Sequence, residues 1–335
     1  MKLKFLKPCA ILACVFFASI SAGLSGCAAK KDSGGKTKVR VALDWTPNTN
    51  HSGVYAAVEK GFFEEEGLSV EIMQPPEDGA LLLTASGGAE YCFDFQESMG
   101  PAIALASNPL PVKAVAAVAA HNTSGILSRR DSPVKRPKDL EGKKFCVWET
   151  PLVVEITRAI VEGDGGDFSK VNMISDYALD AISALQSGID SIWIYYGWDG
   201  VKASISGLDA EYIDFKSIDE KFDFYTPVLV INTNYANENP ALVKKFMSAV
   251  SKGYNYAIEF PKEAADALLK AAPELEAELV YKSQEYLSKA YRADSPVWGW
   301  IDAKRWSGFY EWMYSKGLLQ TDLKEAGFTN EYLPQ

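Results

Sequence analysis

The stretch KVRVALDWTPNTNHSGVYAAVEKGFFEEEGLSVEIMQ, residues 38–74, contains the unit that decides the fold. Residues 38–45 form a β-rich run, and Tyr55, Val58 and Phe62 then recur at the three- and four-residue steps of a helix. Gly67 supplies a helix stop before a second β-rich run at residues 69–74. A strand, a helix and a strand in this order predict two parallel strands joined by a crossover helix.

The same alternation continues along the chain. Further β-rich runs are found at residues 91–95, 112–119, 143–149, 171–175 and 191–196. Ile182 and Leu185 mark a helix that Gly188 closes. From about residue 240 the pattern becomes helical, with Asn239 and Pro240 placed to begin a helix. The sequence therefore predicts an α/β fold with mostly parallel sheets flanked by helices.

The first 27 residues have the layout of a secretory signal peptide rather than of folded structure. Lysines at positions 2, 4 and 7 precede an apolar run, and small residues follow it. The end of this segment, Leu24-Ser25-Gly26-Cys27, resembles the lipobox of bacterial lipoproteins. The resemblance implies removal of residues 1–26, acylation of Cys27 and a polar tether at residues 27–37. The alternatives are a plain signal peptide, or a membrane helix with an incidental cysteine.

Charge and composition exclude several classes of partner. The net charge of the 335 residues is −10, so nucleic acid, which requires a basic face, is not an expected partner. Cys92 and Cys146 are far apart in sequence and are expected to be buried thiols rather than a disulfide framework. With two histidines and no metal-ligand spacing, neither a metal site nor a cofactor is expected.

The loop LDWTPNTNHSG, residues 43–53, is unusually rich in hydrogen-bonding side chains for the end of a strand. Ligands bind at the carboxyl ends of strands in open α/β sheets, so the indole of Trp45 could stack on a flat ring. A core position is the alternative role for Trp45. Asn48 and His51 can each donate and accept hydrogen bonds, which suits ring nitrogens and an exocyclic amine. His51 could equally hold the loop by bonding backbone.

Four segments together make the chain resemble a known family. They are DWTPNTNH (44–51), VAAHNTSGILS (118–128), KDLEGKKF (138–145) and the run from Glu238 to Leu275. They resemble the solute-binding proteins of ABC importers, in the branch that binds taurine, sulfonates and thiamine precursors. WTPNTNHSG and IWIYYGWDG are most similar to the proteins that bind formylaminopyrimidine. The resemblance covers residues 38–332 and implies a two-lobed, periplasmic-binding-protein-like fold of type II.

The lobe boundaries are expected in two irregular stretches, residues 128–144 and 218–227. We therefore expect residues 38–127 and 225–335 to form lobe I and residues 128–224 to form lobe II. In this arrangement the chain crosses between the lobes twice, and the ligand binds between them.

The stretch IWIYYGWDG, residues 192–200, is expected to supply the second half of the binding site. Strand alternation sends Tyr195 and Tyr196 to opposite faces, so only one of them should face the ligand. The resemblance favours Tyr195, opposite Trp45. Asp199 could bind an aminopyrimidine's amine, or could instead be an acid favoured at a helix start. Gln96, with Glu97 beside it, is a weaker candidate from the end of another strand.

The sequence thus predicts a lipid-anchored, extracytoplasmic and monomeric solute-binding protein that passes a small heteroaromatic ligand to an ABC permease. A thiamine-related pyrimidine ranks first, riboflavin or another flat ring second, and a sulfonate lower. The different-class alternative is a pyrimidine synthase. The eukaryotic synthases, which this chain resembles in fold, carry an iron-binding cysteine cluster. The region of this chain that aligns with that cluster is KFDFYTPV, residues 221–228, and it contains no cysteine. No enzymatic activity is therefore expected.

Overall fold

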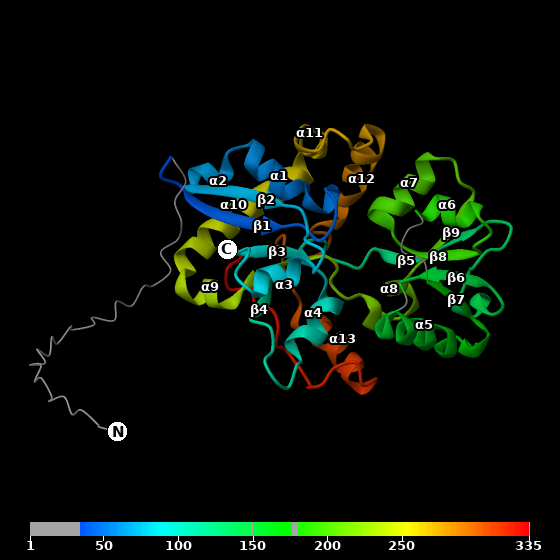
Figure 1. Ribbon diagram of the computed structural model, residues 1–335. Coiled ribbons are helices and arrows are strands. Elements are labelled where there is room, and N and C mark those ends of the chain that lie inside the picture. Colours follow the sequence, from blue (N-terminus) through cyan, green and yellow to red (C-terminus); the bar gives the residue numbers. More distant parts are fainter. Residues whose placement is uncertain (1–33, 149, 176–179, 335) are drawn as a thin grey trace, which may run out of the picture.

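The computed structural model describes residues 34–148, 150–175 and 180–334, which form two lobes side by side (Figure 1). The expected signal peptide and Cys27 lie outside these residues. Within the described part of the chain, no helix is both long and apolar enough to cross a membrane.

The larger lobe is built on a five-stranded sheet of order β2-β1-β3-β10-β4. Its strands are β1 (Thr37–Ala42), β2 (Leu68–Met73), β3 (Tyr91–Asp94), β4 (Val112–Ala117) and β10 (Val228–Asn232). β1 runs parallel to both β2 and β3, with Val39 opposite Val70. The crossover unit predicted from residues 38–74 is confirmed.

The smaller lobe has its own five-stranded sheet, of order β7-β6-β8-β5-β9. Its strands are β5 (Ser124–Arg129), β6 (Lys144–Val147), β7 (Asn172–Ser175), β8 (Ser191–Tyr195) and β9 (Ala210–Asp214). β6 pairs in parallel with β7 and with β8. The β-rich runs predicted β6, β7 and β8, whereas β5 and β9 were not predicted.

One strand in each sheet runs against the others, and each of these strands begins just after the chain has crossed between the lobes. β5 is antiparallel to β8 and β9, and β10 is antiparallel to β3 and β4. The expected crossing after residue 127 would divide β5, whose residues pair only within the second sheet. The pairing puts this crossing before Ser124. The charged stretch from residue 128 begins within β5 and forms the surface connection to β6, which explains why its composition misled the sequence analysis.

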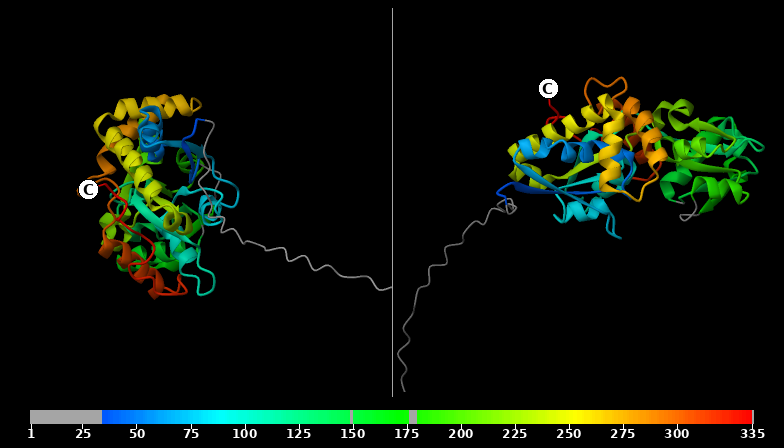
Figure 2. Two further views of the ribbon diagram at one scale, coloured as in Figure 1. Left: turned by 90° about the vertical axis from the view of Figure 1, so that its left-hand side faces the viewer. Right: turned by 90° about the horizontal axis from the view of Figure 1, so that it is seen from above.

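Helices cover both faces of the first sheet, as the view from above shows (Figure 2). The larger lobe contains α1 (Ser52–Glu59), α2 (Phe62–Glu65), α3 (Ala80–Ala85), α4 (Gln96–Ile103), α9 (Thr233–Glu238), α10 (Pro240–Glu259), α11 (Pro261–Ala271), α12 (Ala277–Ala290) and α13 (Ala303–Ser315). The smaller lobe contains α5 (Pro151–Gly163), α6 (Ala181–Gln186), α7 (Val201–Ile205) and α8 (Phe215–Ile218). Short 3-10 turns are η1 (Thr49–His51), η2 (Pro137–Leu140), η3 (Phe168–Lys170) and η5 (Glu220–Phe222), and η4 (Tyr196–Gly200) is π-helical.

The alternation of side chains along β1 divides the core of the larger lobe into two layers. Val39 and Val41 are buried in a cluster with Phe246 of α10, whereas Ala42 joins the cluster on the opposite face. α1 and α10 cross closely, because a Cβ atom on Gly253 would lie 2.0 Å from the carbonyl oxygen of Gly53. This close crossing fixes the start of α1, and with it the loop that follows β1.

The lobes touch through η4 and α12. Ser283 of α12 donates a hydrogen bond to the carbonyl oxygen of Gly197, and its hydroxyl lies 2.5 Å from that of Thr49. The rings of Tyr196 and Tyr286 are 5.1 Å apart. These contacts hold the carboxyl end of β8 close to the loop that follows β1.

Candidate functional site

The loop after β1 is held in shape by its own side chains. The Nδ1 atom of His51 accepts a hydrogen bond from the Asn48 backbone N–H at 3.2 Å. The Nε2 atom must then carry the proton, and it lies 2.6 Å from a carboxylate oxygen of Asp44. The side chain of Asn48 accepts from the Asn50 N–H and donates to the Thr46 carbonyl. His51 is fully buried, so of its two expected roles the structure shows the brace rather than the ligand contact.

Trp45 projects from this braced loop. Its side chain is 60% exposed and makes no ring contact within the described residues. The alternative of a core tryptophan is therefore wrong. The expected opposition of Trp45 and Tyr195 does not appear as a direct contact either.

Gln96, a predicted ligand residue, is instead buried in the larger lobe, where its amide group connects two other segments of the chain. Its Oε1 accepts the Tyr225 backbone N–H at 2.8 Å, and its Nε2 donates to the Trp306 carbonyl at 3.0 Å. Because both ends of this amide are engaged and the residue is fully buried, the ligand role expected for Gln96 is corrected to a structural one. Both partners of Gln96 are more than 120 residues away in the sequence, so local patterns do not reveal them.

The neighbouring residue, Glu97, lies where the two lobes meet. Its Oε1 accepts from the hydroxyl of Thr226 at 3.3 Å and from that of Tyr195 at 3.4 Å. Its Oε2 is shielded from solvent and has no hydrogen-bond partner within the described residues. Burial raises the pKa of Glu97 to about 8; its own backbone N–H opposes this shift, the charge of Asp94 adds to it, and the two hydroxyls also oppose it. At pH 7 the carboxyl group of Glu97 is therefore mostly protonated.

Tyr195 points from the smaller lobe toward the larger one. Its ring lies nearly parallel to that of Phe95, at an interplanar angle of 15° and a centroid separation of 6.4 Å. The ring of Tyr195 also lies near Trp148, with centroids 6.2 Å apart. Tyr196 instead packs between Tyr212 and Tyr286. The two tyrosines thus point in different directions, as alternation predicted, and both contact the larger lobe: Tyr195 lies beside Phe95, and Tyr196 lies beside Tyr286 of α12.

Phe95 was missed by the sequence analysis. β3 ends at Asp94, so Phe95 is the first residue beyond the carboxyl end of that strand, where ligands of α/β sheets bind. That position was the available signal. The β-rich run predicted at residues 91–95 included Phe95 in the strand, and no role was assigned to its side chain.

Asp199 lies one turn after Tyr195, within η4. Its Oδ2 is 3.5 Å from the Tyr195 backbone N–H, which is a long contact. Burial raises the pKa of Asp199 to about 6, and the hydrogen bond from Tyr195 opposes this shift. The position is compatible with both expected roles, since the carboxylate faces the start of a helical segment and also adjoins Tyr195.

Acidic side chains from both lobes gather around these rings. Burial raises the pKa of Asp94 to about 6, against hydrogen bonds from Ser98 and from the Phe95 N–H. The charge of Asp44 acts on both Asp94 and Tyr195. No lysine or arginine within the described residues forms an ion pair with any of these acids. We call the set the inter-lobe cluster: Asp44, Asp94, Phe95, Glu97, Tyr195 and Asp199.

Both segments that cross between the lobes are tied to α13. Arg305 donates to the Ala120 carbonyl at 2.7 Å and to Asp223 at 2.8 Å, one contact on each crossing segment. His121 lies 2.6 Å from Asp223 and 2.8 Å from Asp294, and the hydrogen bond with Asp223 raises the pKa of its imidazole. Charged hydrogen bonds from Arg305 therefore link the two crossing segments to each other and to α13.

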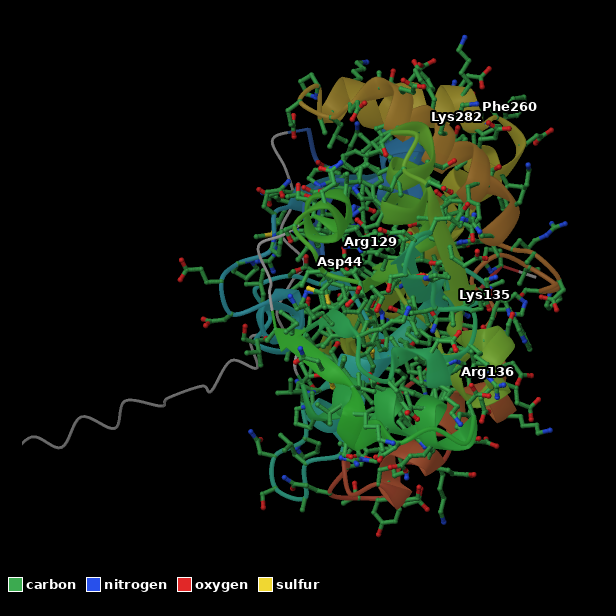
Figure 3. The ribbon with its side chains drawn as sticks, turned by 90° about the vertical axis from the view of Figure 1, so that its right-hand side faces the viewer. Asp44, Arg129, Lys135, Arg136, Phe260 and Lys282 are labelled. Carbon is green, nitrogen blue, oxygen red and sulfur yellow. The ribbon has the colours of Figure 1, made fainter. Side chains whose placement is uncertain are left out.

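Two open hollows lie away from the inter-lobe cluster. One, of about 480 Å³, is bordered by Lys135, Arg136 and α5 in the smaller lobe. The other, of about 790 Å³, lies beside α9 and Arg40 in the larger lobe. In Figure 3, which views the molecule from the smaller lobe, Lys135 and Arg136 lie apart from Asp44. Neither hollow includes a residue of the cluster.

Comparisons with known proteins agree on the class of fold. A family model described as NMT1/THI5 like matches residues 48–264. The chain is 30% identical over 294 residues to the formylaminopyrimidine-binding protein of Halalkalibacterium halodurans, covering 84% of this chain and 86% of that protein. It is 25% identical over 328 residues to 4-amino-5-hydroxymethyl-2-methylpyrimidine phosphate synthase THI11 of Saccharomyces cerevisiae, covering 88% of each.

A solved structure supports the same fold. The periplasmic aliphatic sulphonate binding protein SsuA from Escherichia coli matches with a TM-score of 0.67 at 14% identity, covering 89% of this chain and 92% of that one. At this identity the match shows the fold alone. Together with the two sheets, it confirms the expected two-lobed, periplasmic-binding-protein-like α/β fold.

Proposed function

The chain belongs to the NMT1/THI5-like family, and from this membership and the inter-lobe cluster we propose that it is a solute-binding protein for a thiamine-related pyrimidine. The observation that carries the proposal is the near-parallel pair of Phe95 and Tyr195, one ring from each lobe. A flat heteroaromatic ligand between them gains a stacking face from both lobes. Stacking on one aromatic side chain contributes about 1–3 kcal/mol.

Entry of the ligand requires the lobes to part. A ring inserted between two others needs about 7 Å between them, at about 3.5 Å per contact. The present centroid separation of 6.4 Å is slightly shorter, so the lobes open to admit the ligand and then close on it. A ligand drives closure only through its higher affinity for the closed form, and contacts from both lobes supply that difference.

The charge of the cluster favours an amino-heterocycle over an anion. Asp44, Asp94 and Asp199 can accept hydrogen bonds from an exocyclic amine. A sulfonate would meet these acids with no arginine or lysine paired to them among the described residues. A sulfonate ligand is therefore disfavoured, and riboflavin remains the second candidate because it too is flat and rich in nitrogen.

The synthase alternative is disfavoured by the available metal ligands. Residues 221–228 carry no cysteine, and Cys92 and Cys146 are both buried. Within the described residues, no group of three or more His, Cys, Asp or Glu side chains is placed to hold a metal ion. These residues do not fit an iron centre. Iron content and product formation would separate a synthase from a binding protein.

The same proposal puts the protein on the extracytoplasmic face of the membrane, where acylated Cys27 anchors it beside an ABC permease. Metabolic labelling with a fatty acid tests the anchor. The wild-type chain should incorporate the label and Cys27→Ser should not, and equal labelling of the two would contradict the lipid attachment.

Calorimetry tests the ligand. The folded chain is titrated with formylaminopyrimidine, riboflavin and an alkanesulfonate. We expect tight binding of the pyrimidine and no heat from the sulfonate. Absence of binding by any pyrimidine or flavin would reject the proposed ligand class.

A further inference from the structure

The two carboxyl oxygens of Glu97 differ in their hydrogen-bond partners. Oε1 has two weak partners, the hydroxyls of Thr226 and Tyr195 at 3.3 and 3.4 Å. Oε2 has none within the described residues, although it is shielded from solvent. A buried polar atom without a partner is unfavourable, so natural proteins rarely retain one without a use for it. A ligand atom placed beside Oε2 would supply the missing partner.

Glu97 also lies at the rim of the stacked rings. The hydroxyl at the edge of the Tyr195 ring is its neighbour, and Phe95 is two residues earlier in the chain. A ring held between Phe95 and Tyr195 would therefore present its edge, rather than its face, to Glu97. The edge of a nitrogen heterocycle carries the in-plane lone pairs that accept hydrogen bonds.

Burial and the negative charge of Asp94 favour the neutral form of the Glu97 carboxyl group, whereas its own backbone N–H and the hydroxyls of Thr226 and Tyr195 favour the ionised form. Asp94 approaches from β3, Tyr195 from β8, Tyr310 from α13, and Thr226 from the second crossing segment. The one charge among these neighbours is negative, and no lysine or arginine of the described residues is paired with Glu97. The empty site thus holds a carboxylic acid, which can donate a hydrogen bond, rather than a carboxylate, which only accepts.

We propose that Glu97 is a specificity-determining residue whose protonated Oε2 donates a hydrogen bond to an unprotonated ring nitrogen of the ligand. The inference rests on the proposed function, because it requires the ligand to enter between Phe95 and Tyr195. It narrows the ligand class to flat heterocycles with an in-plane nitrogen lone pair. An anion, or a ring without such a nitrogen, leaves the donor unpaired.

The proposed hydrogen bond predicts how many protons the protein takes up when the ligand binds. Below about pH 8 Glu97 already carries its proton, so binding exchanges none with solvent. Above that pH the empty site has lost the proton, and forming the O–H···N bond takes up one proton from solvent. Affinity should then fall about tenfold from pH 7 to pH 9, in proportion to the protonated fraction.

The experiment is calorimetry with formylaminopyrimidine from pH 7 to pH 9, in two buffers of different ionisation enthalpy. For the wild-type protein we expect proton uptake to rise from near zero toward one, with about tenfold weaker binding at pH 9. Glu97→Gln keeps an N–H donor that does not titrate, so its binding should take up no proton and change little with pH. Glu278→Gln, on the exposed surface of α12, is the matched control and should behave like the wild type.

The other groups that titrate near neutral pH do not obscure the proton uptake expected from Glu97. Asp94 and Asp199, with pKa values of about 6, titrate below this range, and His121 is present in all three proteins. The wild-type proton uptake stands even if Glu97→Gln folds poorly. Pyrimidine binding with no proton uptake at pH 9 would overturn the role of Glu97 alone. No pyrimidine binding at any pH would overturn the proposed function and this inference together.

Discussion

The neutral state of Glu97 predicts an unusual dependence of stability on pH in the empty protein. The pKa of this carboxyl group is raised from 4.5 to about 8 in the folded state. Between these pH values the folded chain holds a proton that the unfolded chain has released. Stability contributed by this group is therefore fully present below about pH 4.5 and is lost as the pH rises toward 8.

The magnitude follows from the proton difference. One proton held only by the folded state changes the free energy of unfolding by about 1.4 kcal/mol per pH unit. From pH 5.5 to pH 7.5 the wild-type protein should lose about 2–3 kcal/mol relative to Glu97→Gln, whose amide does not titrate. Asp94 and Asp199 are present in both proteins, so their contributions cancel in this comparison.

Urea unfolding at pH 5.5, 6.5 and 7.5 is the assay, with the slope of unfolding free energy against urea checked for constancy. Glu278→Gln serves as the exposed control and should follow the wild type. A difference between wild type and Glu97→Gln that stays constant over these two pH units would refute the reasoning. It would mean that Glu97 is ionised in the folded protein.

Three other side chains of the site make separate predictions. Phe95→Ala should weaken formylaminopyrimidine binding about 10–100-fold, because one stacking face worth about 1–3 kcal/mol is lost. Calorimetry measures the affinity, and Phe260→Ala, which removes an exposed ring, is the control. Equal affinities of the two variants would exclude Phe95 from the site. Trp45→Ala should weaken binding but leave the melting temperature of the empty protein nearly unchanged, because the indole is exposed. A large fall in melting temperature with affinity retained would contradict this. His51→Ala should lower the free energy of unfolding by about 1–3 kcal/mol, because the shielded carboxylate of Asp44 loses its hydrogen-bond partner. Urea unfolding measures this, and an unchanged free energy of unfolding would show that the His51 hydrogen bonds are dispensable.

Much of the architecture could be read from local patterns. The crossover unit at residues 38–74 was predicted because strand and helix periodicities are properties of consecutive residues. β5 and β10 were not predicted as strands. Each follows a lobe crossing, and its antiparallel pairing is decided by partners distant in sequence.

The loop after β1 also combines a feature that local sequence predicts with one that only the folded structure decides. Asn48 and His51 are three residues apart, so their mutual capping is a local interaction that the sequence could suggest. The choice between a ligand contact and a brace for His51 depends on its burial and on the Asp44 carboxylate, and both are set by the folded structure. Gln96 was misassigned for the same reason, since its partners lie on α13 and on the second crossing segment.

The sequence by itself determined the alternation of strands and helices, the resemblance to importer-associated binding proteins and the aromatic and acidic segments from which a site could be built. Only the tertiary structure decided which of these residues meet. Phe95 and Tyr195 are 100 positions apart, and their near-parallel rings depend on how the two lobes dock through η4 and α12. The burial that keeps Glu97 neutral arises from the same docking, because desolvation is a property of the surroundings and not of the residue.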